Sequence, residues 1–212
     1  MRWDDLFEDL ESQLEQELGA EHVDLLAEEE RLRLGRLTLR DRLLAMTRPT
    51  STVVGGPVRD GSVGASADDD LRLALRDGQL VSVSVGSIGR DWLVGELRGP
   101  RRGSCLVPLG GIASVLPTPA QLARSLDGDD ASDVPVHLSA RLGLSFVLRD
   151  LCRRRASLDL STASGERMHG TIDRVGRDHL DLAEHEAGVP RRAAAVTRIR
   201  MLPLEQLVLV RF

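Results

Sequence analysis

Apolar residues recur every three or four positions near the start of the chain, with acidic side chains between them. Residues at this spacing share one face of a helix, so the pattern predicts an amphipathic helix over residues 3–18. The predicted apolar stripe consists of Trp3, Leu6, Phe7, Leu10, Leu14 and Leu18. Two uses of the stripe remain open, which are packing on the chain's own body and docking to a protein partner or a second copy.

A block at residues 71–116 has a different period. Val81, Val83 and Val85 alternate with small or polar residues, which is the period of two expected for a half-buried strand. Further short apolar runs at 92–94, 105–107 and 112–115 are separated by glycine-containing turns. Residues 156–212 repeat this alternation, so both halves predict several short antiparallel strands.

Two pentapeptides indicate that the halves are diverged copies of one unit. Gly-Arg-Asp-Trp-Leu at 89–93 matches Gly-Arg-Asp-His-Leu at 176–180, and each follows one apolar strand and begins another. Upstream, Leu-Arg-Asp at 39–41 matches Leu-Arg-Asp at 148–150, and the larger separation fits an insertion in the Gly- and Pro-rich segment 48–70. The Gly-Arg-Asp element is interpreted as a structural turn, because Gly and Asp both favour tight turns.

These patterns predict an α+β, mainly β fold with two small barrel-like modules, each led by a short helix. The expected divisions are an acidic helical arm at 1–30, a first module at 31–116, a linker at 117–135 and a second module at 136–212. Within the linker, a short helix is predicted near residues 118–126.

Charge is distributed unevenly between the arm and the rest of the chain. Residues 1–30 contain twelve acidic residues and only Arg2 as a fixed positive charge, although the whole chain has a net charge of −5. Every fixed positive side chain is arginine, because the chain contains no lysine. Aromatic residues make up 2% of the chain, so the core must be aliphatic, and few rings are present to stack on nucleic-acid bases.

The chain lacks the common motifs of nucleotide-binding and hydrolytic enzymes. A Walker loop needs a lysine, and neither a Gly-x-Gly-x-x-Gly turn nor a Gly-x-Ser-x-Gly elbow is present. His169, His179 and His185 lie near several acids, but their spacing matches no strong metal signature, and they are interpreted as solvated strand and turn residues. Cys105 and Cys152 show neither metal spacing nor a disulfide framework. We therefore expect no enzyme activity, no cofactor, no metal site, no membrane-spanning segment and a cytoplasmic location.

Clusters of arginine provide the candidate contacts to phosphate groups. If the clusters converge on one face, they could bind the backbone of RNA or DNA. The sequence pI near 5.6 argues against strong nonspecific affinity. The candidates are Arg98, Arg101, Arg102, Arg153, Arg154, Arg155, Arg191 and Arg192.

Two resemblances add to this interpretation. Gly165-Glu-Arg-Met-His-Gly170-Thr-Ile172, followed by Asp178-His-Leu180-Asp-Leu182, resembles the Sm-like and SH3-like small barrels, which implies a five-stranded meander after a helix. Asp178 comes two residues later than in the Sm-like pattern, and the asparagine that contacts RNA in that family has no counterpart. The opening Met1-Arg-Trp-Asp-Asp-Leu-Phe7 resembles an uncharacterised actinobacterial protein family, which implies no activity.

The expected function is therefore a non-catalytic interaction or regulatory adaptor with tandem small β modules. In this hypothesis a protein partner or a second copy binds through the N-terminal helix. The alternative is a regulator that binds RNA or DNA through the arginine clusters.

Overall fold

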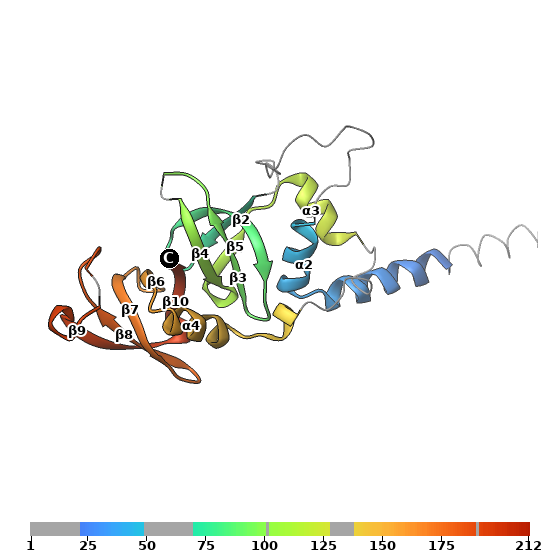
Figure 1. The fold of residues 1–212 in the computed structure, drawn as a ribbon. Coiled ribbons are helices and arrows are strands. Elements are labelled where there is room, and N and C mark those ends of the chain that lie inside the picture. Colours follow the sequence, from blue (N-terminus) through green and yellow to red (C-terminus); the bar gives the residue numbers. More distant parts are fainter. Residues whose placement is uncertain (1–21, 49–69, 101, 128–137, 190) are drawn as a thin grey trace, which may run out of the picture. The chain divides into compact units, whose positions relative to one another are not determined.

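The computed structural model of the chain describes residues 22–48, 70–100, 102–127, 138–189 and 191–212 (Figure 1). The chain divides into two compact units between Leu39 and Arg40. The predicted apolar stripe at Trp3, Leu6, Phe7, Leu10 and Leu14 lies outside the described residues, as does Arg101.

In the first unit, the described part contains a helix over residues 22–36. This helix continues past residue 30, where the acidic arm was expected to end. Arg33 pairs with Glu30 at 2.6 Å, one helical turn earlier, and this hydrogen bond lowers the pKa of the Glu30 carboxyl. The helix also exposes five large aliphatic side chains, which are Val23, Leu25, Leu26, Leu32 and Leu34.

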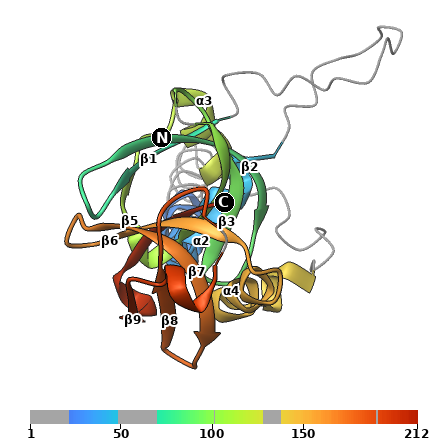
Figure 2. The same cartoon turned by 60° about the vertical axis from the view of Figure 1, so that its left-hand side comes forward.

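The second unit contains one ten-stranded antiparallel sheet in the order β5-β1-β2-β3-β4-β10-β6-β7-β8-β9 (Figures 1 and 2). Five strands come from the first half: β1 Leu71–Leu75, β2 Leu80–Ile88, β3 Trp92–Leu97, β4 Gly103–Pro108 and β5 Ile112–Val115. Five come from the second: β6 Ser157–Thr162, β7 Arg167–Val175, β8 His179–Glu184, β9 Arg198–Pro203 and β10 Leu207–Arg211. The α+β class is confirmed.

The expectation of two small barrels is wrong in one respect. The pairing runs through both halves without a break and ends at β5 on one side and β9 on the other, so the sheet is not a closed barrel. Local periodicity predicted the strands, but it carries no information about which edges pair across the halves.

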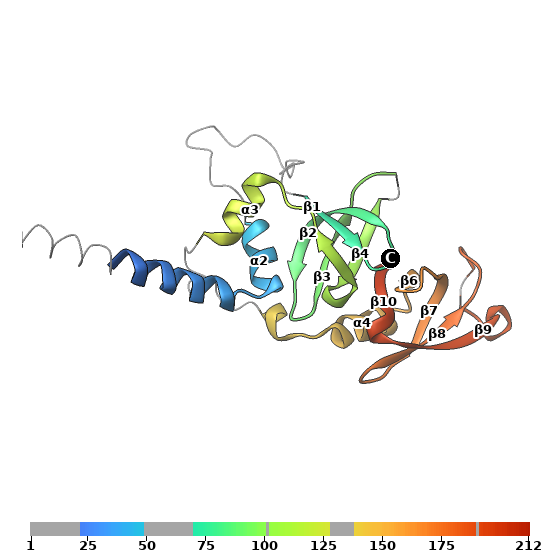
Figure 3. The same ribbon diagram turned by 180° about the vertical axis from the view of Figure 1, so that it is seen from behind.

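Three α-helices accompany the sheet, as Figure 3 shows from behind. They are α2 Leu39–Met46, α3 Pro119–Leu126 and α4 Leu144–Arg153. The predicted helix near 118–126 is confirmed as α3. It begins here because Thr118 and Gln121 form a capping box at its start. Short 3₁₀ turns at Leu109–Gly111 and Leu204–Gln206 connect β4 to β5 and β9 to β10.

The two halves of the sheet share one pairing register. We call α2 with β1–β5 the first module and α4 with β6–β10 the second module. Leu71 pairs with Val83, as Leu158 pairs with Gly170, and Leu93 pairs with Val107, as Leu180 pairs with Leu202. The register shift between Val85 and Ser87 in β2 recurs between Ile172 and Arg174 in β7, at the same offset of 87. Each paired strand position of one module therefore has a defined counterpart in the other.

The matching pentapeptides occupy equivalent places in this register. Gly89 N–H donates to the carbonyl of Trp92, and Gly176 N–H donates to the carbonyl of His179, each at 2.8 Å. The helices that lead the two modules contact these turns in the same way. Arg40 on α2 donates to Gly89 O at 2.7 Å, and Arg149 on α4 donates to Gly176 O at 3.4 Å.

Candidate functional site

The two modules are joined where β10 pairs with β4. Val210 lies opposite Leu106 and Arg211 opposite Cys105, and the N–H of Phe212 donates to the carbonyl of Ser104 at 3.1 Å. Since β10 also pairs with β6, its position in the sheet is central, and residues 207–210 are fully buried. A strand buried on both faces needs an unbroken apolar run, and Leu-Val-Leu-Val at 207–210 supplies it.

Side chains from this joint cross between the two hydrophobic cores. Leu106 leaves its own module and packs in the core of the second, with Leu148 and Leu207. In return, Val208 and Leu209 pack in the core of the first module. The modules therefore share their cores, and the joint is part of the fold.

The turn at Gly89–Trp92 completes the joint. The carboxylate of Asp91 accepts a hydrogen bond from the N–H of Leu144 at 2.7 Å, which caps the first turn of α4. The indole N–H of Trp92 donates to the carbonyl of Leu142 at 2.9 Å, and the ring joins the core of the second module. One end of the first module, formed by β4 and this turn, thus receives the second module.

The corresponding end of the second module is open in the part of the chain that the structure describes. Met201 on β9 is the register counterpart of Leu106, yet its side chain is 67% exposed where that of Leu106 is fully buried. Ile199, two residues earlier on the same strand, is 64% exposed. Asp178, the counterpart of Asp91, has an 84% exposed side chain that pairs with His179 at 2.8 Å. This hydrogen bond lowers the pKa of the Asp178 carboxyl.

The complementary free edge is β5. On β5, Val115 lies opposite Leu73 of β1. On β10, Val210 lies opposite Leu160 of β6, which is the counterpart of Leu73. Val115 is therefore the counterpart of Val210. The N–H of Leu116 donates to Arg72 on β1. Because successive N–H groups of a strand point to opposite sides, the N–H of Val115 points to the open edge. Pro117 stands where the second module has Phe212, and a proline has no N–H to donate.

The exposed side chains of β9, the open turn at Asp178 and the free strand β5 form two candidate binding edges, which the sequence analysis missed. The β9 edge consists of Ile199 and Met201 with the turn at Gly176–His179, and the β5 edge is centred on Val115. The signal was present in the exposed apolar pair of β9. It could be recognised only after the register showed that Met201 replaces a buried residue.

The structure distributes the predicted phosphate-contacting arginines over several ion pairs. Arg98 pairs with Asp70 at 3.2 Å, and Arg154 pairs with Asp150 at 2.7 Å, as does Arg153. Arg102 borders a pocket beside β4, and Arg192 precedes the 3₁₀ turn Ala193–Ala195.

Among the candidates that the structure describes, Arg155 and Arg191 come from segments far apart in the sequence and meet on one carboxylate, because both pair with Asp173. These two ion pairs lower the pKa of the Asp173 carboxyl, with the hydrogen bond from Arg191 as the largest cause.

The three neighbouring histidines are not assembled into one cluster. His169 and His185 meet edge to face with ring centroids 5.4 Å apart, whereas His179 lies at the turn with Asp178. Within the described ranges, no group of three or more His, Cys, Asp or Glu side chains is placed to hold a metal ion.

One hydrogen-bonded chain of side chains was not anticipated. Ser157 Oγ lies 2.9 Å from His169 Nε2, and His169 Nδ1 lies 2.7 Å from Asp159 Oδ1. This order of groups is that of serine hydrolases, in which a buried aspartate orients the base and backbone donors stabilise the oxyanion. Here the Asp159 side chain is 51% exposed and also faces Arg211 at 3.7 Å, so water and a competing cation weaken its field at the histidine.

The two cysteines lie in different surroundings. Cys105 is fully buried in β4, and burial raises the pKa of its thiol to about 11. Cys152 is half-buried, and its Sγ lies 3.4 Å from the carbonyl of Asp173. Both thiols are free.

The register and the joint define two five-stranded antiparallel modules fused edge to edge. Comparison of the chain with protein-family models, with curated proteins and with solved structures gave no match. Among the described residues, no helix is both long enough and apolar enough to cross a membrane.

Proposed function

We propose that this chain is a non-catalytic interaction protein that assembles with further copies of itself. The β9 edge of one copy pairs with the β5 edge of the next, in the register that joins β4 to β10 inside the chain. The observation that carries this proposal is the exposure of Met201, which occupies the place of the buried Leu106.

The internal joint specifies the contacts expected between copies. Val115 would lie opposite Met201, and Leu116 opposite Arg200, as Val210 lies opposite Leu106 and Arg211 opposite Cys105. The Met201 side chain would then enter the core of the neighbouring first module.

Two exposed apolar side chains, Ile199 and Met201, lie on the edge strand β9, and the unpaired edge of a sheet is a template for pairing with another chain. The edges that meet are different, so repeated pairing closes a ring or extends a filament. Pro117 removes one hydrogen bond that Phe212 makes in the internal joint, so pairing between copies is weaker than pairing within the chain.

The mass of the full chain in solution, measured by size-exclusion chromatography with light scattering over a series of concentrations, tests the proposal. The wild-type chain is expected to show multiples of 23.1 kDa, and Met201→Asp to reduce this assembly, because a carboxylate cannot enter an apolar core unpaired. Leu80→Asp is the matched control, since Leu80 is 68% exposed but lies on the interior strand β2. A wild-type mass of 23.1 kDa throughout the series contradicts the proposal.

A crosslink tests the register directly. A hydrogen-bonded antiparallel pair places its Cα atoms about 5.5 Å apart, within the usual range for a disulfide. In a Cys152→Ser background, Val115→Cys with Met201→Cys is expected to give crosslinked multimers on mild oxidation. Leu80→Cys with Val115→Cys is the control and is expected to give few.

Nucleic-acid binding through the arginine clusters receives less support. Arg98, Arg153, Arg154, Arg155 and Arg191 each already pair with an acidic side chain. A phosphate backbone would have to replace these partners.

A further inference from the structure

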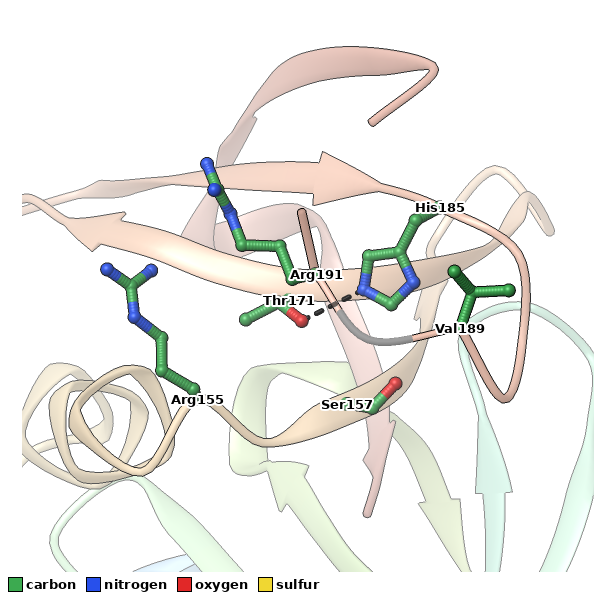
Figure 4. A pocket seen from close by; sticks show the side chains of 6 residues that line it. All are labelled: Arg155, Ser157, Thr171, His185, Val189 and Arg191. Atoms are coloured by element: carbon green, nitrogen blue, oxygen red, sulfur yellow. Dashed lines mark hydrogen bonds between the residues drawn. The ribbon is translucent and has the colours of Figure 1, made fainter. Parts of the chain in front are cut away.

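A pocket of about 410 Å³ opens on the second module between the end of α4, the start of β6 and the loop after β8 (Figure 4). This volume lies in the range of small-molecule sites. Figure 4 shows two arginines on one side of the pocket and a histidine with an apolar residue on the other. The lining residues are Arg155, Ser157, Thr171, His185, Val189 and Arg191.

Arg155 has an unusual backbone conformation. Its φ of 53° is positive, and every other described residue with a positive φ is a glycine. The N–H of Arg155 donates to Cys152 O and that of Ala156 to Leu151 O, which is the turn that ends α4. Glycine is strongly favoured at such a helix end because it has no Cβ. Strained residues of this kind concentrate at functional sites, which makes Arg155 a candidate functional residue.

The charges on the arginine side of the pocket do not cancel. Asp173 accepts from Arg155 through Oδ1 at 3.0 Å and from Arg191 through Oδ2, so one carboxylate faces two guanidinium groups. The Nε of Arg191 is buried and has no hydrogen-bond partner among the described residues. A buried donor without an acceptor is costly, and the side chain that carries it lines the pocket.

The remaining polar groups are already engaged. His185 Nδ1 lies 3.0 Å from the carbonyl of Glu186, and a carbonyl can only accept, so Nδ1 carries a proton. In this tautomer Nε2 accepts from the hydroxyl of Thr171 at 2.9 Å. The hydroxyl of Ser157 is held in the same way by His169. The two guanidinium groups are therefore the principal donors to a ligand, and Val189 gives the pocket an apolar wall.

We propose that this pocket binds the phosphoryl group of a small phosphorylated molecule, with Arg155 and Arg191 as its ligands. A phosphate monoester has three acceptor oxygens, enough to reach both guanidinium groups, and its about two negative charges more than offset the one positive charge that Asp173 leaves uncompensated. Val189 would then contact the organic group. This site does not depend on the edge pairing proposed above.

The experiment is isothermal titration calorimetry of the full chain with inorganic phosphate and with phenyl phosphate, at low ionic strength. Wild-type protein is expected to bind both, and phenyl phosphate more tightly because of Val189. Arg155→Gly is expected to weaken binding at least tenfold without lowering the melting temperature, because glycine suits the positive φ. Arg191→Gln is expected to weaken it similarly.

Arg154→Gln is the matched control, since Arg154 is adjacent on the chain but pairs with Asp150 and does not line the pocket. It should bind phosphate as the wild type does. Asp173→Asn is expected to tighten binding, because it removes the carboxylate that competes with the ligand for both arginines. No binding by the wild type, or equal binding by wild type and Arg155→Gly, overturns the proposal. Binding of single-stranded RNA in preference to both small phosphates also overturns it.

Discussion

The carboxylate of Asp91 in the first module accepts a hydrogen bond from the backbone N–H of Leu144, the first residue of the helix that leads the second module. Asp91→Ala is expected to lower the free energy of unfolding by about 0.5–2 kcal/mol, the usual effect of losing a helix cap. Chemical denaturation measures this change. Asp178→Ala is the control at the equivalent turn, where the side chain is 84% exposed, and equal losses from both variants would contradict a capping role.

The shared cores predict that the two modules unfold together. Leu209→Ala truncates a side chain that comes from the last strand of the chain but packs in the core of the first module. The expected cost is about 2–5 kcal/mol, as for other buried leucines. Thermal unfolding followed by circular dichroism should show one transition at a lower temperature. Two separate transitions, with only one of them shifted, would show that the modules are independent.

Acid should weaken the contacts around Asp173. Its pKa in the folded chain is lowered by the hydrogen bond from Arg191, while the unfolded value is about 3.9. A lowered folded pKa stabilises the protein above the unfolded value, and this contribution is lost as the pH falls from about 4 through the folded pKa. Denaturation at a series of pH values should show a shallower loss of stability in acid for Asp173→Asn than for the wild type. Identical acid profiles would contradict the prediction.

The two thiols should react at very different rates. Burial raises the pKa of Cys105 to about 11, so almost no thiolate is present at pH 8, and the side chain is also inaccessible. Cys152 is only half-buried. Mass spectrometry after brief alkylation of native protein should find the label on Cys152, and on Cys105 only after unfolding. Early labelling of Cys105 would mean that the joint between β4 and β10 opens readily.

Ser157 should not behave as a catalytic nucleophile, although it lies in hydrogen-bonded sequence with His169 and Asp159. The half-exposed Asp159 shares its charge with Arg211, so it polarises the histidine weakly. A fluorophosphonate probe should leave the native chain unmodified, with a known serine hydrolase as the positive control. Labelling that disappears in Ser157→Ala would instead establish a reactive centre here.

Local patterns along the chain determined the elements of the fold. Alternation at Val81, Val83 and Val85 predicted β2, and the short helix predicted near residues 118–126 is α3, because strand period and helix initiation depend on neighbouring residues alone. The pairing of Arg155 and Arg191 on one carboxylate had no such local signal, since the two arginines come from segments that only the folded sheet brings together.

Tertiary structure alone decided how the two halves combine. The alternation predicted over residues 156–212 includes the apolar run at 207–210, but this run is equally compatible with an edge strand of the second module and with the central strand that unites both. The choice depends on which edge Leu106 and Val210 present to each other, a contact between residues about a hundred positions apart. Periodicity reports which face of a strand is buried, and it contains no term for the neighbour that buries it.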